Sequence, residues 1–265
     1  MPLYDPAKRG EKRLVPTEDG TPTLYSAEFD ECYHSTRDGA LSESLNKHVR
    51  PAFTLLEPRE EIAILDICFG LGYNTLATLH WLQTHRPGQK VSIYAPEFDR
   101  ELVASLMEFD YPEAFAPLRP VIEAVAREGR YEDERWRIEV LFGDAREMIR
   151  TIDRPVDIIY QDAFSPAKNP LLWTREWFAD LRTLCAEDAV LTTYSVAAST
   201  RMGLYENGFH LYEYRPEATR KSLIGSPSPL NKSLEGLNPI DMELKIRRNP
   251  EAKSLRDSEF EREDQ

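Results

Sequence analysis

A short glycine turn is the first feature of this sequence that could bind a ligand. It reads Asp-Ile-Cys-Phe-Gly-Leu-Gly-Tyr-Asn over residues 66–74 and follows a strand-like apolar run. Glycine lets a backbone approach a ligand closely, and in open α/β sheets ligands bind beside the carboxyl ends of the strands. A nicotinamide-dinucleotide fingerprint needs Gly-x-Gly-x-x-Gly, but its third glycine position holds Thr75, which disfavours NAD. An ordinary tight turn between a strand and a helix is the alternative interpretation.

Two carboxylates follow the next two strand-like runs. Glu97 comes about 25 residues after the glycine turn, where a Rossmann-like site places the carboxylate that accepts hydrogen bonds from ribose hydroxyls. Asp144 is placed to accept a hydrogen bond from the exocyclic amine of adenine, although it could equally cap the following helix. The turn also fits the methyltransferase pattern acidic-x-Gly-x-Gly-x-Gly, with Cys68 in place of the first glycine. Together these features favour S-adenosyl-L-methionine as the cofactor.

The loop from Gln161 to Trp173 is the strongest signal, because it is dense in functional residue types. It follows the fourth strand-like run, where the sheet edge would open toward a transferable methyl group. Asp162 is the candidate catalytic residue: its carboxylate could orient an amine and receive its proton, or only orient the amine while water takes the proton. A proline-rich turn capped by Asp162 is the structural alternative. The predicted cofactor-binding residues are Asp66, Phe69, Gly70, Gly72, Asn74, Glu97, Asp144 and Asp162.

A regular alternation of strands and helices must position these residues. Such an alternation implies parallel βαβ units with right-handed crossovers, and nearly continuous apolar strands indicate a sheet covered on both faces. We therefore expect a Rossmann-like, doubly wound, mostly parallel α/β sheet with an N-terminal hairpin and helix. Strands are predicted at residues 61–67, 90–95, 137–142, 155–160 and 189–194, a closing pair at 209–214 and 222–224, and helices at 74–84, 99–109, 145–151, 174–185 and 197–207.

The chain divides into three parts by composition. Residues 1–57 contain a loosely held arm over 1–20, then a small hairpin and a helix. Residues 58–225 form the methyltransferase-like core, with a helical insertion near 112–135. The charged tail, 226–265, has few apolar anchors, which favours disorder over the docking of a partner.

The bulk composition excludes several classes of protein. No run of about 18 apolar residues exists, so we expect no membrane span, and the polar residues 1–13 are unlike a signal peptide. The widely spaced Cys32, Cys68 and Cys185 fit reduced thiols in a cytoplasmic protein, and we expect no metal. The net charge of −13 argues mildly against nucleic acid, although a local basic face can survive within an acidic total.

These motifs together resemble the methyltransferase domain of MnmC-type tRNA modification enzymes. The resemblance covers the Phe-Gly-x-Gly-x-Asn turn, Glu97, the loop from Asp162 to Trp173, and the stretch from Ser26 to Ser35 with Gly39 and Glu43 after it; it also includes Thr193, Tyr194, Ser195, Arg220 and Lys221. It implies methylation of the aminomethyl group on the wobble uridine, in the anticodon loop of tRNA. Cys68 departs from the usual glycine, no FAD-dependent oxidase domain follows, and the tail has no counterpart. We therefore expect a stand-alone, monomeric methyltransferase.

The substrate-binding residues fall into two chemical groups. Aromatic side chains could stack on an extruded base, and basic ones, with Arg201 and Arg215, could form a phosphate-binding face. An aminopropyltransferase-like or small-molecule methyltransferase is the alternative enzyme, because an acidic protein suits a cationic small substrate. A module that holds the cofactor or RNA without turnover is the third possibility. The predicted substrate-binding residues are Phe29, Tyr33, Phe164, Lys168, Tyr194, Arg220 and Lys221.

Overall fold

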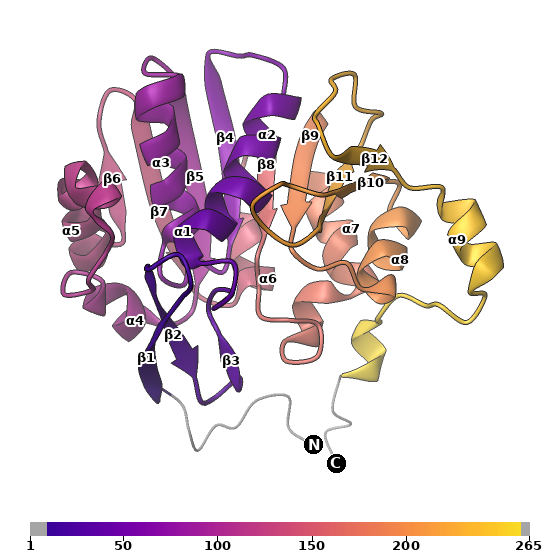
Figure 1. Ribbon diagram of the computed structural model, residues 1–265, viewed down its shortest axis with the longest axis horizontal. Coiled ribbons are helices and arrows are strands. Elements are labelled where there is room, and N and C mark those ends of the chain that lie inside the picture. The colour runs from indigo at the N-terminus through magenta and orange to yellow at the C-terminus, as the bar shows by residue number, and fades with distance from the viewer. Residues whose placement is uncertain (1–9, 261–265) are drawn as a thin grey trace.

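The computed structural model describes residues 10–260, and one large sheet dominates this part of the chain (Figure 1). The nine strands of the sheet lie in the order β12-β10-β11-β9-β8-β4-β5-β7-β6. The five neighbours from β9 to β7 run parallel, whereas β6, β10, β11 and β12 pair antiparallel with their neighbours. The strands are β4 (Glu61–Ile67), β5 (Lys90–Glu97), β6 (Arg130–Glu132), β7 (Trp136–Phe142), β8 (Val156–Gln161), β9 (Cys185–Thr193), β10 (His210–Tyr214), β11 (Ser222–Ser226) and β12 (Leu237–Pro239).

Helices cover both faces of the sheet, and each face has its own apolar core (Figure 1). Successive side chains of a strand point to opposite faces. In β4, Ile62 and Ile64 join one core, and Leu65 and Ile67 the other. The doubly wound, mostly parallel architecture is thereby confirmed. One face holds α3 (Tyr73–His85), α4 (Arg100–Ser105) and α5 (Arg119–Glu128), and the other holds α6 (Ala145–Met148), α7 (Arg175–Leu184) and α8 (Ala198–Glu206).

The predicted helical insertion is confirmed. It contains the 3-10 helix η3 (Glu113–Leu118) and α5, whose apolar residues pack on the first core. Short 3-10 turns also follow α6, at η4 (Ile149–Thr151), and precede α7, at η5 (Pro170–Trp173). No helix among residues 10–260 combines the length and apolar character that a membrane crossing requires.

The N-terminal part packs beside the carboxyl ends of the parallel strands. It contains a three-stranded antiparallel sheet, β1 (Lys12–Pro16), β2 (Pro22–Ser26) and β3 (Glu31–Cys32). A continuous helical stretch follows, made of α1 (Ala40–Glu43), the π-helical η2 (Ser44–Val49) and α2 (Arg50–Leu55). The hairpin and helix are as predicted, but the loose arm is wrong for residues 12–16, because β1 pairs with β2 along its whole length. Residues 1–9 of that arm lie outside the described residues.

The C-terminal tail is ordered through residue 260, so the prediction of disorder is wrong there. β12 extends the main sheet beside β10, and α9 (Met242–Arg248) is capped by the Asp241 side chain. Met242 is buried in the second core, and the 3-10 helix η6 (Asp257–Glu259) follows. Arg256 pairs with Glu176, and Arg146 pairs with Asp257. A few well-placed anchors therefore hold a segment whose average composition indicated disorder. Residues 261–265 lie outside the described part.

Candidate active site

A cavity of about 700 Å³ opens at the carboxyl ends of β4, β5, β7 and β8, beside the N-terminal segment. This volume is within the range of ordinary ligand sites. Four of the predicted residues do not line it: Asp66, Gly72, Lys168 and Lys221. The predicted residues that do line it are Phe29, Tyr33, Phe69, Gly70, Asn74, Glu97, Asp144, Asp162, Phe164, Tyr194 and Arg220.

The glycine turn is held in a left-handed backbone conformation and is tied to the end of β5. Cys68, Gly70 and Gly72 have φ values of 63°, 54° and 70°. The amide of Gly70 donates to Glu97 Oε2 at 2.8 Å. A Cβ on Gly70 would lie 3.0 Å from the Tyr33 ring, and one on Gly72 would lie 2.7 Å from Phe69. Gly72 therefore makes room for the Phe69 ring, and it is Phe69 that faces the cavity.

Glu97 is a buried carboxylate at the wall of the cavity. Its two oxygens accept hydrogen bonds from the amides of Gly70 and Asp99, at 2.8 and 2.9 Å. Burial raises the pKa of Glu97, while these backbone donors oppose the shift. Each carboxylate oxygen has a second lone-pair direction, so Glu97 retains acceptor capacity for a ligand hydroxyl.

Asp66 lies beneath the turn and supports it from below. Its carboxylate accepts from Thr75 Oγ1 at 2.8 Å and faces Asn74 Nδ2 at 3.4 Å. Burial raises the pKa of Asp66 to about 7. Asp144 lines the cavity, and its side chain caps α6 by accepting from the Arg146 amide.

Asp162 is bound from two sides. Its Oδ2 accepts from Asn74 Nδ2 at 2.8 Å, and its Oδ1 lies 3.5 Å from His48 Nε2. Burial by itself would raise the pKa of Asp162, but His48, His34 and the Asn74 amide outweigh it and lower the pKa. The side chain is therefore a carboxylate at neutral pH, and it faces the cavity.

Two histidines near Asp162 were not singled out from the sequence. His34 lines the cavity and is buried, and neither of its ring nitrogens has a hydrogen-bond partner within residues 10–260. His48 is fully buried in η2, with its Nδ1 2.8 Å from Thr192 Oγ1. A lone histidine on an apolar helix gives no signal in the sequence, although His34 falls within the stretch 26–35 that resembles the family.

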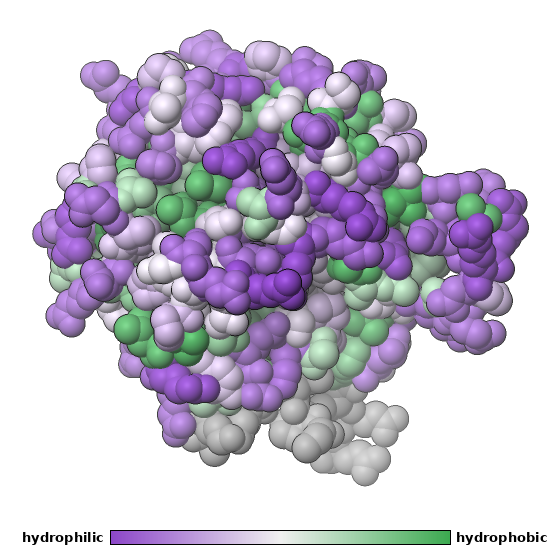
Figure 2. Space-filling view, in the orientation of Figure 1, coloured by the Kyte–Doolittle hydropathy of each residue, from purple (hydrophilic) through white to green (hydrophobic). Residues whose placement is uncertain are grey.

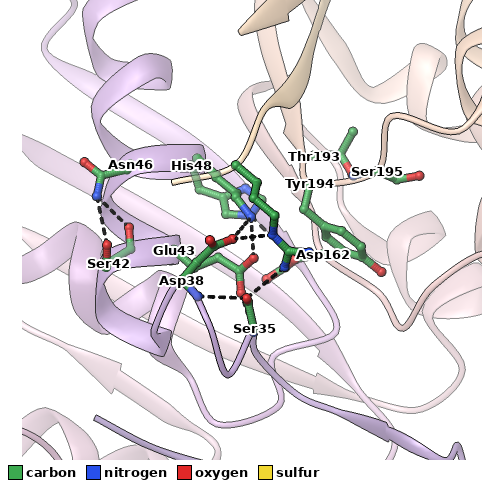
Figure 3. Close-up of polar contacts among 12 residues, drawn as sticks. Ser35, Asp38, Ser42, Glu43, Asn46, His48, Asp162, Thr193, Tyr194 and Ser195 are labelled. Atoms are coloured by element: carbon green, nitrogen blue, oxygen red, sulfur yellow. Dashed lines mark hydrogen bonds and ion pairs between the residues drawn. The ribbon is translucent and has the colours of Figure 1, made fainter. Parts of the chain in front are cut away.

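A buried ion cluster braces the N-terminal wall of the cavity (Figure 3). Lys47 Nζ lies 2.7 Å from both Asp38 Oδ2 and Glu43 Oε1. Glu43 also accepts from the amide of Ser35 at 2.8 Å. Figure 3 shows the labelled side chains of Ser35, Asp38 and Glu43 converging. Arg220 joins from the loop before β11, through Asp38 at 3.2 Å and Ser35 Oγ at 2.9 Å. Arg220 is thus partly engaged, although 60% of its side chain is exposed.

Aromatic rings form one side of the cavity. Phe29 and Phe164 are stacked with centroids 4.5 Å apart, and Tyr33 meets Phe164 edge-on at 5.0 Å. The Tyr194 hydroxyl donates to the carbonyl of Ala163 at 2.9 Å, which fixes its ring beside Asp162. Trp173 and Trp177 are fully buried and belong to the core.

Three of the other predicted basic residues carry carboxylate partners, whereas Arg201 donates to the carbonyl of Val196 at 2.7 Å. Lys168 pairs with Asp30 at 2.9 Å. Arg215 and Lys221 share Glu213, at 2.7 and 3.2 Å. The positive charge of this surface is therefore partly neutralised, in a way that residue counts along the sequence did not reveal.

Comparisons with known proteins agree with this geometry. A family model described as S-adenosyl-L-methionine-dependent methyltransferase matches residues 111–226. The crystal structure of MNMC2 from Aquifex aeolicus superimposes with a TM-score of 0.82 and 32% identity, covering 98% of this chain and 83% of that chain. The tRNA 5-methylaminomethyl-2-thiouridine biosynthesis bifunctional protein MnmC of Azoarcus sp. is 35% identical over 73% of this chain and 32% of its own length.

Another curated relative extends the similarity. An uncharacterised protein of Methanocaldococcus jannaschii is 29% identical over 86% of this chain and 63% of its own length. The chain thus spans about a third of the bifunctional MnmC protein and less than two thirds of the archaeal protein.

Proposed function

The chain belongs to the MnmC-type family of S-adenosyl-L-methionine-dependent methyltransferases, and we propose that it methylates the exocyclic amine of 5-aminomethyluridine, or its 2-thio form, at the wobble position of tRNA. The product would be the methylaminomethyl nucleoside that the name of its MnmC relatives contains. The observation that carries the proposal is Asp162, a buried carboxylate that faces a cavity walled by the glycine turn and Glu97.

The residues around the glycine turn fit the cofactor. Asn74 Oδ1 is buried without a hydrogen-bond partner in the described part of the chain, and Glu97 retains acceptor capacity toward the cavity. In this proposal Glu97 would hold the ribose hydroxyls and Asp144 the adenine amine, with Phe69, Gly70 and Asn74 completing the wall. When bound, the cofactor supplies an electrophilic methyl group. Asp66 and Gly72 act indirectly, by supporting Asn74 and Phe69.

The charge of the cavity lining favours a cationic substrate group. Glutamate and aspartate side chains outnumber the arginines there, and two of the arginines, Arg146 and Arg220, are paired with Asp257 and Asp38. An aminomethyl group is largely protonated at neutral pH, because alkylamines resemble the lysine side chain in pKa. The lining would attract it as an ammonium ion, and Asp162 would orient it and accept a proton. The lining carboxylates are Glu28, Glu31, Glu43, Glu97, Asp144 and Asp162.

The aromatic wall suits a base removed from its stack. Phe29, Phe164 and Tyr33 form a contiguous apolar surface beside Asp162. Enzymes that modify a nucleobase commonly extrude it and hold it between aromatic side chains. The wobble uridine would lie against this surface, so that its aminomethyl arm reaches the carboxylate.

Methyl transfer to defined tRNA tests the proposal. We expect tritium from labelled cofactor to enter the methylaminomethyl nucleoside of tRNA that carries 5-aminomethyl-2-thiouridine. Asp162→Ala should retain cofactor binding in calorimetry but lose most of kcat, since the carboxylate interacts chiefly with the amine during reaction.

Two outcomes would contradict this assignment. Activity of Asp162→Ala within a fewfold of wild type would remove Asp162 from the reaction. Label that enters polyamines or other small amines but not tRNA would favour the small-molecule or aminopropyltransferase-like alternative.

A further inference from the structure

The proposed reaction releases a proton that the cavity must accept. The substrate begins as R–NH₃⁺, and one N–H bond must break before the nitrogen lone pair is available for methylation. In the proposed function Asp162 orients this ammonium group at the cavity wall. A carboxylate binds an ammonium ion well but is a weak base, so a second proton acceptor beside it would complete the transfer.

His48 occupies that place. Its Nε2 faces Asp162 Oδ1 at 3.5 Å, and it does not line the cavity, whereas Asp162 does. Asn74 holds the other carboxylate oxygen, which leaves Oδ1 as the oxygen turned toward the imidazole. Nε2 is buried without a hydrogen-bond partner in residues 10–260. A fully buried nitrogen without a hydrogen-bond partner lowers the stability of the fold, unless it gains a partner during the reaction.

Thr192 lies against the other ring nitrogen of His48. Its hydroxyl in β9 lies 2.8 Å from Nδ1, and both side chains are fully buried. The Tyr160 ring of β8 packs edge-on against the imidazole, with centroids 5.5 Å apart. In the tautomer whose Nδ1–H donates to Thr192, the lone pair of Nε2 points toward Asp162, and this is the form that can take up a proton.

We propose that His48 holds the proton that the substrate amine releases, receiving it through Asp162. The amine N–H bond breaks as an O–H bond forms on Asp162 Oδ1, and the proton then passes to Nε2 of His48. The result is an imidazolium beside a carboxylate, with a neutral amine in the cavity. After methylation the proton returns through Asp162 to solvent, because His48 has no exposed surface. His48 never touches the substrate and acts only through Asp162.

The other charged and titratable groups around His48 are consistent with this role. His34 lies toward the cavity, and burial lowers its pKa, which makes it a poor proton acceptor. Asp66, beneath Asn74, is partly protonated near neutrality because burial raises its pKa. Lys47 is committed to Asp38 and Glu43. Asp162 is thus the carboxylate that directly stabilises a protonated His48.

The pH dependence of kcat in His48→Gln tests the inference, which rests on the proposed function. Glutamine retains an amide that can donate to Asp162 but cannot take up a proton. For the full chain acting on aminomethyl tRNA, we expect kcat of the variant to depend more steeply on pH than kcat of the wild type, because only the wild type holds a proton acceptor behind Asp162. The variant should lose about 100-fold near pH 7, a typical contribution of general base catalysis. It should regain activity toward pH 9, with KM for tRNA and cofactor affinity little changed.

Matched variants separate this role from a structural one. His210→Gln changes an exposed histidine and should behave as wild type. Thr192→Val keeps the shape of a β-branched residue but removes the Nδ1 partner, and should move the pH profile in the same direction by a smaller amount. If His48→Gln does not fold, Thr192→Val provides the test. A wild-type pH profile in Thr192→Val would then contradict the inference.

Other outcomes decide against it directly. An unchanged profile in His48→Gln, or an equal loss at every pH, would show that His48 only fills space. Wild-type protein that transfers no methyl group to this tRNA at any pH would instead refute the proposed function, and the inference with it.

Discussion

Asp66 illustrates how one buried carboxyl links the cofactor turn to pH. Its pKa is raised from 3.8 to about 7 by burial, so between these values the folded state binds the proton more tightly than the unfolded state. The free energy of unfolding that Asp66 contributes therefore falls as pH rises through this window, and stays constant above it.

Asp66→Asn removes this titration while keeping an oxygen for Thr75. We expect the variant to gain stability relative to wild type as pH rises from 4 to 7, by up to about 4 kcal/mol at 1.36 kcal/mol per pKa unit. Urea denaturation at a series of pH values measures the difference. Parallel stability curves for the two proteins would show that Asp66 is not protonated in the fold.

We expect two further residues to control cofactor affinity for different reasons. Glu97→Ala removes both the proposed ribose acceptor and the partner of the Gly70 amide, so we expect a large loss of affinity. Gly72→Ala adds a methyl group 2.7 Å from Phe69 at a φ of 70°, which forces the ring into the cavity. Calorimetric titration measures both, and wild-type affinity in either variant would contradict its place in the site.

At the scale of the element, the π-helical η2 depends on a buried ion cluster. Lys47 neutralises Asp38 and Glu43, and all three are buried. Removing one partner of a buried pair leaves uncompensated charge and costs about 3–5 kcal/mol. We therefore expect Lys47→Met to lower the free energy of unfolding by about that amount in chemical denaturation.

A surface pair provides the control for this prediction. Lys90 and Glu60 are 3.3 Å apart but mostly exposed, so Lys90→Met should change stability by less than about 1 kcal/mol. The combination Lys47→Met, Asp38→Asn and Glu43→Gln should recover much of the lost stability, because it also removes the two carboxylates that Lys47→Met leaves unpaired. Equal effects of Lys47→Met and Lys90→Met would mean that the cluster contributes no more than a surface pair.

At the scale of the whole molecule, the net negative charge opposes the binding of RNA. The net charge is −13, and Figure 2 shows hydrophilic side chains over most of the face viewed. The proposed tRNA contact rests on a few cations near the cavity, several of them paired with carboxylates. Three or four phosphate contacts would give log affinity against log salt a slope of roughly −2 to −4.

Charge reversal measures this local face. Arg220→Glu with Lys221→Glu should weaken tRNA binding and flatten the salt slope, while leaving cofactor affinity unchanged. Arg130→Glu, an exposed change in β6 at the far edge of the sheet, is the matched control. If wild-type protein shows no salt-dependent binding to aminomethyl tRNA, the tRNA contact is wrong.

The sequence by itself determined the features that depend on local pattern. The run 61–67 is β4 to the residue, because continuous apolar residues followed by glycines define a buried parallel strand and its turn. Glu97 and Asp162 were found by their position after strands, since the carboxyl ends of parallel strands share one edge. That these two residues meet at one cavity could therefore be predicted from the sequence.

Only the tertiary structure decided the features that depend on contacts between distant segments. His48 meets Asp162 and Thr192 across more than a hundred residues of chain, and no local periodicity records such a pairing. The ordered tail depends on Met242 entering the second core. The requirement for glycine at position 72 depends on where the Phe69 ring lies. Local sequence specifies conformation and amphipathic pattern, whereas the partner of a buried polar group is settled only when the layers pack.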